Sequence, residues 1–423
     1  RVYTLRARQD GFATATPGNL RTEPAAIEND FYRVEADGAT GTFTLLDKAT
    51  GTRYPGLNQF VDGGDVGDLY NYCPPVEDSL VSQPHQPAHV EVVTEGTVRA
   101  ALRFTMRYAL PRRAVRSRHA RHSETVECAI TSEVALAPGV RRVSVRTTVH
   151  NAARDHRLRV RFPVPFRVAH SDAEGAFDVV RRPARQPEPA AGQAPWSEWA
   201  EAPVDTHPQK RFVDVSDGAV GLAVLNRGLP EYEVLPEAAP GGAAVALTLL
   251  RAVEWLSRGD LTTRRGHAGP AILTPGGQCL GDHTFAYALL PHAGAWDAAG
   301  MPVAQAAEDF EADLRAEATG IHAGPLPLRW SGVTLAPAEL TLSALKRAER
   351  EDALVLRAYN PTTRPISATV RLHRPFREVR LVNLNEDAVP EAEAAAHRLA
   401  SEGGHTARLA VRAGEIVTLL FRF

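Results

Sequence analysis

The run Val98-Arg-Ala-Ala-Leu-Arg-Phe-Thr-Met-Arg-Tyr108 alternates between two kinds of side chain with a period of two residues. One face carries Val98, Ala100, Leu102, Phe104, Met106 and Tyr108, and the other carries Arg99, Arg103 and Arg107. Such alternation is typical of antiparallel strands that bury one face and leave the other in water. This run therefore predicts a fold built from antiparallel sheets.

The same period-two pattern recurs along most of the chain, at 143–149, 158–166, 353–359, 369–372, 379–384 and 416–423. Pro163 and Pro165 lack an N–H donor, so the run at 158–166 is either an edge strand or the end of a strand. Only Val303–Ala318 has helical spacing, through Val303, Ala307, Phe310 and Leu314. We expect an all-β protein with a connecting segment at 1–22, a large β domain at 23–320 and a small C-terminal β-sandwich at 321–423.

Composition excludes several function classes. The 423 residues carry a formal charge of -2, which does not favour nucleic acid or an anionic membrane as partner. The longest mainly apolar run, 243–250, is far shorter than the ~20 residues that cross a bilayer. Cys73, Cys128 and Cys279 are widely spaced, which argues against a disulfide framework or a structural zinc site and favours a reducing, cytoplasmic location. The start at Arg1, with no leader pattern, leads us to expect a piece of a longer polypeptide.

The most unusual stretch is the loop Asp62-Gly-Gly-Asp-Val-Gly-Asp-Leu-Tyr-Asn-Tyr-Cys-Pro-Pro75. Its glycines allow backbone angles that other residues avoid, and its aspartates can hydrogen-bond their own backbone in turns. Tyr70 and Tyr72 share a face if the chain is extended there. Carboxylates beside paired aromatic rings suit a sugar, whose hydroxyls need acceptors and whose C–H face packs on a ring. The alternative is an acidic hairpin tip followed by an ordinary strand.

Two further polar segments could contribute to a binding site or could be purely structural. In 249–270, Asp260, Arg264, Arg265 and His267 gather on a long loop, where an arginine could hold sugar hydroxyls or where an Asp–Arg pair could simply hold the loop. The arginine-rich segment 112–121 is interpreted as a solvated hairpin loop.

Several motifs, in order, resemble the β-rich C-terminal half of glycoside hydrolase family 38 α-mannosidases, in a form similar to the bacterial branch. They are Asn29–Val34, Gly41–Gly51, Gly64–Pro74, Gly228–Tyr232, Arg265–Pro270 and Thr274–Phe285. The resemblance implies a large supersandwich like that of galactose mutarotases, followed by smaller β structure. It also implies that the nucleophile, the acid/base and the zinc ligands lie in an N-terminal catalytic domain, which nothing in this chain matches.

The resemblance therefore implies a chain with no catalytic or metal-binding residues, inactive alone, that completes the pocket of a retaining, zinc-dependent α-mannosidase. Its partners would be the N-terminal catalytic domain of the same polypeptide and a mannose-containing glycan, with homo-oligomerisation left open. The resemblance implies Tyr70 and Arg265 as substrate-binding residues, and our hypothesis adds Asp65 and Asp68 of the acidic loop.

Two alternatives stay open at this point. One is a stand-alone carbohydrate-binding or scaffold module. The other is a mutarotase-like sugar epimerase, which would need a histidine such as His267 or His283 and a carboxylate facing one cleft.

Overall fold

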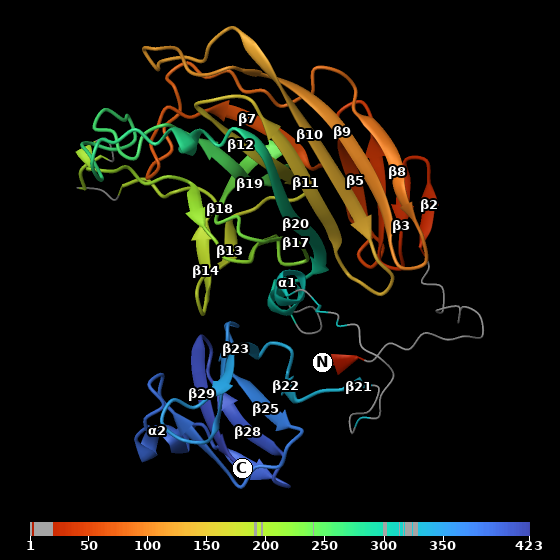
Figure 1. The fold of residues 1–423 in the computed structure, drawn as a ribbon, viewed down its shortest axis with the longest axis vertical. Coiled ribbons are helices and arrows are strands. Elements are labelled where there is room, and N and C mark those ends of the chain that lie inside the picture. The colour runs from red at the N-terminus through yellow and green to blue at the C-terminus, as the bar shows by residue number, and fades with distance from the viewer. Residues whose placement is uncertain are drawn as a thin grey trace. The chain divides into compact units, whose positions relative to one another are not determined.

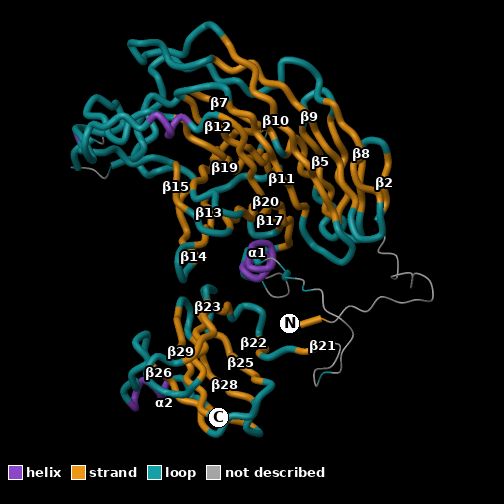
Figure 2. The backbone as a smooth tube through the Cα atoms, in the orientation of Figure 1, coloured by secondary structure: helices purple, strands orange, loops and turns teal. Residues whose placement is uncertain are grey.

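The computed structural model describes residues 2–3, 20–189, 193–195, 198–239, 241–298, 303–312, 314–315, 317, 324 and 329–423. The chain forms two compact units. The larger comprises Ala15–Ala173 and Arg181–Trp296, and the smaller comprises Arg1–Thr14, Glu174–Val180 and Asp297–Phe423. Within the described residues, strands are the main regular structure of each unit and the helices are short (Figure 2).

The largest sheet has nine strands, and its long members β9, β10, β11 and β20 run side by side (Figure 1). In spatial order the strands are β14 (Val179–Pro183), β13 (His170–Glu174), β16 (Phe212–Ser216), β17 (Val220–Asn226), β20 (Gly281–Ala293), β11 (Val143–Asn151), β10 (Thr125–Leu136), β9 (Ala100–Pro111) and β8 (His89–Glu95).

Two five-stranded sheets complete the larger unit. One has the order β15 (Thr206–Pro208), β18 (Glu231–Ala239), β19 (Gly242–Ala252), β12 (His156–Val164) and β7 (Gln59–Gly64). The other has the order β2 (Arg21–Glu23), β3 (Ala26–Glu28), β4 (Tyr32–Asp37), β5 (Thr42–Asp47) and β6 (Arg53–Leu57). A short 3-10 helix, η2 (Pro275–Gln278), precedes β20.

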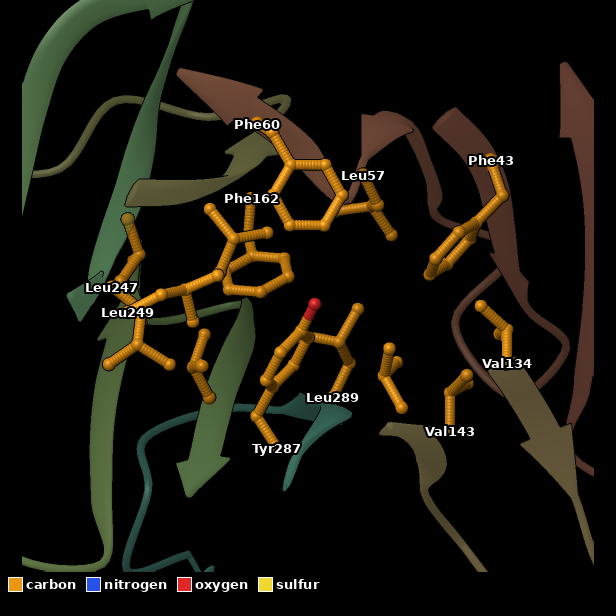
Figure 3. Packing of buried hydrophobic residues seen from close by; sticks show 14 of the residues in the cluster. Phe43, Leu57, Phe60, Val134, Val143, Phe162, Leu247, Leu249, Tyr287 and Leu289 are labelled. Carbon is orange, nitrogen blue, oxygen red and sulfur yellow. The ribbon is translucent and has the colours of Figure 1, made fainter. Parts of the chain in front are cut away.

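The apolar faces of these sheets meet in one core. Phe162 of β12 and Tyr287 of β20 come from different sheets and pack edge to face, with ring centres 5.6 Å apart (Figure 3). The Tyr287 hydroxyl is also paired: it donates to Asn58 Oδ1 at 2.6 Å and lies 2.7 Å from the Thr147 hydroxyl. The hydroxyl and oxygen atoms of this group are therefore paired inside the core, which avoids the cost of burying them without a partner.

The smaller unit contains two four-stranded sheets with their own apolar core. One has the order β22 (Val333–Ala336), β25 (Ile366–Leu372), β28 (Thr406–Val411) and β27 (Ala400–Glu402). The other has the order β23 (Thr341–Arg347), β24 (Leu354–Asn360), β29 (Glu415–Arg422) and β26 (Glu378–Val382). The short pair β1 (Val2–Tyr3) and β21 (Arg329–Trp330) and the helices α1 (Val303–Glu311) and α2 (Glu391–Ala396) complete it.

The all-β prediction is confirmed, as is the order of a large multi-sheet sandwich followed by a smaller one. Pro163 lies near the end of β12, beyond the last pair with β7 at Arg161, as its missing donor requires. The predicted helix is shorter than expected, because α1 ends at Glu311 and Leu314 is 88% exposed. The domain limits at 22/23 and 320/321 stay a prediction, and residues 320 and 321 lie outside the described residues.

Candidate functional site

A cavity of about 830 Å³ lies beside the five-stranded sheet that contains β12, β18 and β19. The described residues that line it all belong to the larger unit. The residues from the loop 62–75 are Tyr70, Asn71, Tyr72 and Pro74. The sheet supplies Arg157, Glu231, Glu233 and Arg251, and the segment before and within β15 supplies Asp205, Thr206 and His207.

Asp65 holds the first turn of this loop from inside. Its Oδ1 accepts the backbone N–H groups of Gly67 at 3.0 Å and Cys73 at 3.3 Å, and its Oδ2 accepts from Arg251 Nε at 2.8 Å. A Cβ at Gly67 would lie 2.1 Å from the Asn71 carbonyl oxygen, so only glycine fits this turn. Burial raises the pKa of Asp65, and the Arg251 guanidinium opposes that rise.

Asp68 holds the second turn. Its Oδ1 accepts the N–H groups of Tyr70 at 3.0 Å and Asn71 at 2.8 Å. Its Oδ2 accepts from Arg264 Nη2 at 2.6 Å and from the Arg258 N–H at 2.8 Å. Burial raises the pKa of the Asp68 carboxyl, but these hydrogen bonds outweigh burial and hold the pKa below its usual value.

Tyr70 therefore lies on a turn whose backbone is held by hydrogen bonds to Asp65 and Asp68. Its side chain is 54% exposed and lies on the cavity wall. A Cβ at Gly269 would come within 2.9 Å of the Tyr70 hydroxyl, so the ring lies against the backbone of a second loop, the polar segment that ends at Pro270. The Ser257 hydroxyl accepts the Gly269 N–H at 3.1 Å and helps to fix that loop.

Charged side chains on the outward face of the sheet form another wall of the cavity. The Arg157 guanidinium lies 3.6 Å from the centre of the Tyr72 ring, a cation–π contact. Its nitrogens are 3.5 Å from Glu231 and 3.7 Å from Glu233. Glu233 also pairs with Arg159, whose pKa falls to about 10 through burial and the nearby Arg157 charge.

Asp62, the first carboxylate of the loop, has a purely internal role in this structure. It is fully buried, pairs with Arg121, and lies with Oδ2 2.5 Å from His156 Nδ1. The interpretation of segment 112–121 as a solvated loop is therefore wrong for Arg121, which is buried. A run of arginines cannot show which member will meet a distant aspartate.

The expected binding residues fall into separate places. Tyr70 lines the cavity, whereas Asp65 and Asp68 lie beneath it as supports for the loop. Arg265 is exposed and lies outside the cavity wall, and it is the adjacent Arg264 that is buried against Asp68. His283 Nε2 lies 2.8 Å from the Cys279 carbonyl oxygen, and neither His283 nor His267 lines the cavity.

Sequence reasoning overlooked the polar face of the sheet. Arg157, Arg159 and Arg161 alternate with Leu158, Val160 and Phe162, so the period-two rule already placed the arginines together. Their proximity to Glu231 and Glu233 depends on β19 lying between β12 and β18, which is a long-range pairing.

No group of three His, Cys, Asp or Glu side chains among the described residues could share a metal ion. The residues present thus offer no zinc site, and no step through zinc is assigned to them. No described helix combines the length and apolar character that spanning a membrane requires.

Two family models match this chain. The model described as "Glycosyl hydrolases family 38 C-terminal domain" matches residues 27–257, and the model described as "Glycosyl hydrolases family 38 C-terminal beta sandwich domain" matches residues 339–419. The two matches fall on the larger and the smaller unit in turn.

Curated relatives and solved structures agree with these matches. A putative mannosylglycerate hydrolase of Halalkalibacterium halodurans is 26% identical over 93% of this chain and 41% of its own length. Alpha-mannosidase 2C1 of Homo sapiens is 26% identical over 86% of this chain and 31% of its own length. The crystal structure of an alpha-mannosidase from Enterococcus faecalis superposes with a TM-score of 0.80 at 26% identity, over 96% of this chain and 43% of that one. This chain thus spans less than half the length of these relatives.

Proposed function

The chain belongs to the C-terminal domain family of the family 38 glycosyl hydrolases, and from that premise we propose that it completes the sugar pocket of a retaining α-mannosidase. In this proposal it supports a catalytic region, which the family resemblance implies to be N-terminal to it. The substrate is an α-linked mannoside, in keeping with the names of those relatives.

The observation that carries the proposal is the presentation of Tyr70. The Tyr70 ring is about half exposed on the cavity wall, where a ligand can reach it. Here two buried carboxylates, Asp65 and Asp68, fix the turn that carries it. A rigid ring of this kind can pack on the C–H face of a sugar while its hydroxyl donates or accepts a hydrogen bond.

The reaction itself needs more than this wall. Glycoside hydrolysis with retention uses two carboxyl groups about 5 Å apart, one as nucleophile and one as acid/base. We assign both, together with the zinc that the family resemblance implies, to the accompanying catalytic region. The role of this chain is to bind and orient the sugar, which raises the effective concentration of the reacting groups.

A chimaera tests the proposal. The matched region of the Enterococcus faecalis alpha-mannosidase is replaced by this chain, and hydrolysis of an aryl α-mannoside is measured beside this chain alone. We expect turnover by the chimaera and none by the isolated chain with or without added zinc. In the chimaera, Tyr70→Ala should lower kcat/KM by about tenfold to a hundredfold, the loss of one well-placed contact.

The matched control is Leu345→Ala, which removes an exposed apolar side chain of the smaller unit. It should leave kcat/KM unchanged. Turnover by the isolated chain, or a Tyr70→Ala chimaera as active as the control, would contradict the proposal.

A stand-alone binding module is the second candidate, favoured by one observation: the larger unit by itself supplies both aromatic and charged cavity residues, among them Tyr70, Tyr72 and Arg157. In that case the chain would bind a glycan, yet hydrolysis by the chimaera would not depend on Tyr70. The chimaera therefore separates the two candidates.

A further inference from the structure

We propose that the cavity beyond Tyr70 is a subsite for a neutral, hydroxyl-rich unit of the substrate, a second sugar, and that it discriminates against a carboxylate or phosphate group. The inference rests on the proposed function for the identity of the first sugar. The residues that carry it are Arg157, Glu231 and Glu233, none of which contributes to the support of Tyr70.

Arg157 is the first observation. Its side chain is 5% exposed, and its Nη1 makes no hydrogen bond, although it lies 3.5 Å from a carboxylate oxygen of Glu231. A buried guanidinium is costly unless its five N–H donors are satisfied. Tyr72 covers one face of the guanidinium, and Nη1 is the buried nitrogen that lies without a hydrogen-bond partner beside the cavity.

The two glutamates are the second observation. Glu231 and Glu233 keep 27% and 19% of their side-chain surface exposed, and both line the cavity. An ionised carboxylate only accepts hydrogen bonds, and a guanidinium only donates them. A sugar hydroxyl does both, so it can accept from Arg157 while it donates to a glutamate. A carboxylate or phosphate group on the ligand has no proton to give to either glutamate.

The net charge of the cavity wall also disfavours an anionic ligand. Three arginines line the cavity, namely Arg157, Arg185 and Arg251, against five carboxylates, namely Glu188, Glu201, Asp205, Glu231 and Glu233. Arg251 pairs with Asp65, Arg185 with Glu237 and Glu233 with Arg159, and these three partners lie outside the wall. Arg157 then stands against Glu188, Glu201, Asp205 and Glu231. The remaining surplus of negative charge repels an anion and leaves a neutral ligand unaffected.

Size and shape are compatible with this occupant. A volume of about 830 Å³ falls within the usual range of small-molecule sites. Tyr70 and Tyr72 both belong to the wall, so an oligosaccharide that packs on Tyr70 reaches the Arg157 end without leaving the cavity. The cavity thus supplies an aromatic surface at one end and paired donors and acceptors at the other.

Isothermal titration of this chain with two probes tests the inference. The neutral probe is an α-linked mannobiose, and the anionic probe is mannosylglycerate, which has a carboxylate in place of the second sugar. We expect mannobiose to bind at least about tenfold more tightly than mannosylglycerate, the effect of one charge-assisted hydrogen bond. Arg157→Gln should weaken the binding of mannobiose by about tenfold. Glu231→Gln should narrow the difference in affinity between mannobiose and mannosylglycerate.

The matched control is Arg146→Gln, because Arg146 is exposed on β11, outside the cavity wall. It should bind both probes as the wild type does, and thermal unfolding should show that each variant is folded. If Arg157→Gln does not fold, Glu231→Gln and Glu233→Gln still test the inference, because each should narrow the difference in affinity between the two probes. The inference is overturned if mannosylglycerate binds as tightly as mannobiose, if neither binds, or if the cavity variants match Arg146→Gln.

The proposed function has a separate readout, the Tyr70-dependent hydrolysis by the chimaera. Loss of probe discrimination with hydrolysis intact would overturn this inference alone. Preference for mannobiose with no Tyr70-dependent hydrolysis would overturn the proposed function and leave the neutral saccharide site standing.

Discussion

Arg251 Nε donates to Asp65 Oδ2 at 2.8 Å across a separation of 186 residues, and the aspartate is fully buried. The same guanidinium donates through Nη2 to the Asp68 carbonyl oxygen at 2.9 Å. One side chain of β19 therefore holds both turns of the loop that carries Tyr70. The sheet therefore fixes the acidic loop, and the carboxylates of Asp65 and Asp68 stabilise the loop from inside.

Asp65→Asn tests this relationship. The substitution keeps the shape of the side chain but removes the charge that balances Arg251 inside the protein. Breaking a buried pair by removing one partner costs about 3–5 kcal/mol, so we expect a loss of that order in the free energy of unfolding, measured with urea. Asp260→Asn is the control, because Asp260 is 62% exposed and its pairs with Arg118 and Arg258 are worth about 1 kcal/mol or less. Equal losses in the two variants would contradict the supporting role of Asp65.

The pH dependence of stability follows from Asp68. Its pKa is lowered in the folded protein, although burial opposes the hydrogen bonds from Arg264 and the backbone N–H groups. The folded state therefore binds this proton more weakly than the unfolded chain does. Its stabilisation is fully present above the unfolded carboxyl pKa of about 3.9 and is lost as the pH falls through the lower, folded value.

We expect the difference in unfolding free energy between wild type and Asp68→Asn to be constant from pH 7 to about pH 5 and to shrink below about pH 4. Urea unfolding at a series of pH values measures it. Glu95→Gln removes an exposed carboxylate at the end of β8 and provides the control. A difference that grows as the pH falls would show that the sign assigned to Asp68 is wrong.

Gly67 is required by close contacts, with no need of a left-handed backbone. A methyl group there would lie 2.1 Å from the Asn71 carbonyl oxygen and 2.8 Å from Asp65 Oδ1. Gly67→Ala should therefore destabilise the protein by about 1–3 kcal/mol, the usual cost of overpacking, and should increase hydrogen exchange at Tyr70. Gly276→Ala is the matched control, because a Cβ at Gly276 meets nothing within 4 Å. If Gly67→Ala is as stable as Gly276→Ala, the turn is less tightly held than the structure indicates.

The fold was readable from the sequence because its strands obey a local rule. The faces of β9 follow from alternation alone, and Leu102 and Phe104 are buried as the pattern requires. The sequence predicts only part of the candidate site. The sequence picked out Tyr70 and its acidic loop, but Asp65 meets Arg251 only after strands far apart in sequence have paired. Local periodicity contains no information on such partners, so it does not distinguish the buried Arg121 from the other arginines of its segment or show that Arg157 lies near Glu231.

Arg264 and Arg265 provide the sharpest test of how the second loop is built, because adjacent residues of an extended chain face opposite ways. Arg264 is buried and donates to Asp68 and to the Arg258 carbonyl oxygen at 2.9 Å, whereas Arg265 is exposed. We expect Arg264→Gln to cost about 3–5 kcal/mol in the free energy of unfolding and Arg265→Gln about 1 kcal/mol or less. If Arg265 contacts the sugar, as the family resemblance implies, Arg265→Gln should instead lower kcat/KM in the chimaera while stability stays near that of the wild type. A stable, fully active Arg265→Gln chimaera would remove Arg265 from the pocket, and a strongly destabilised one would show that the two neighbours share the structural role.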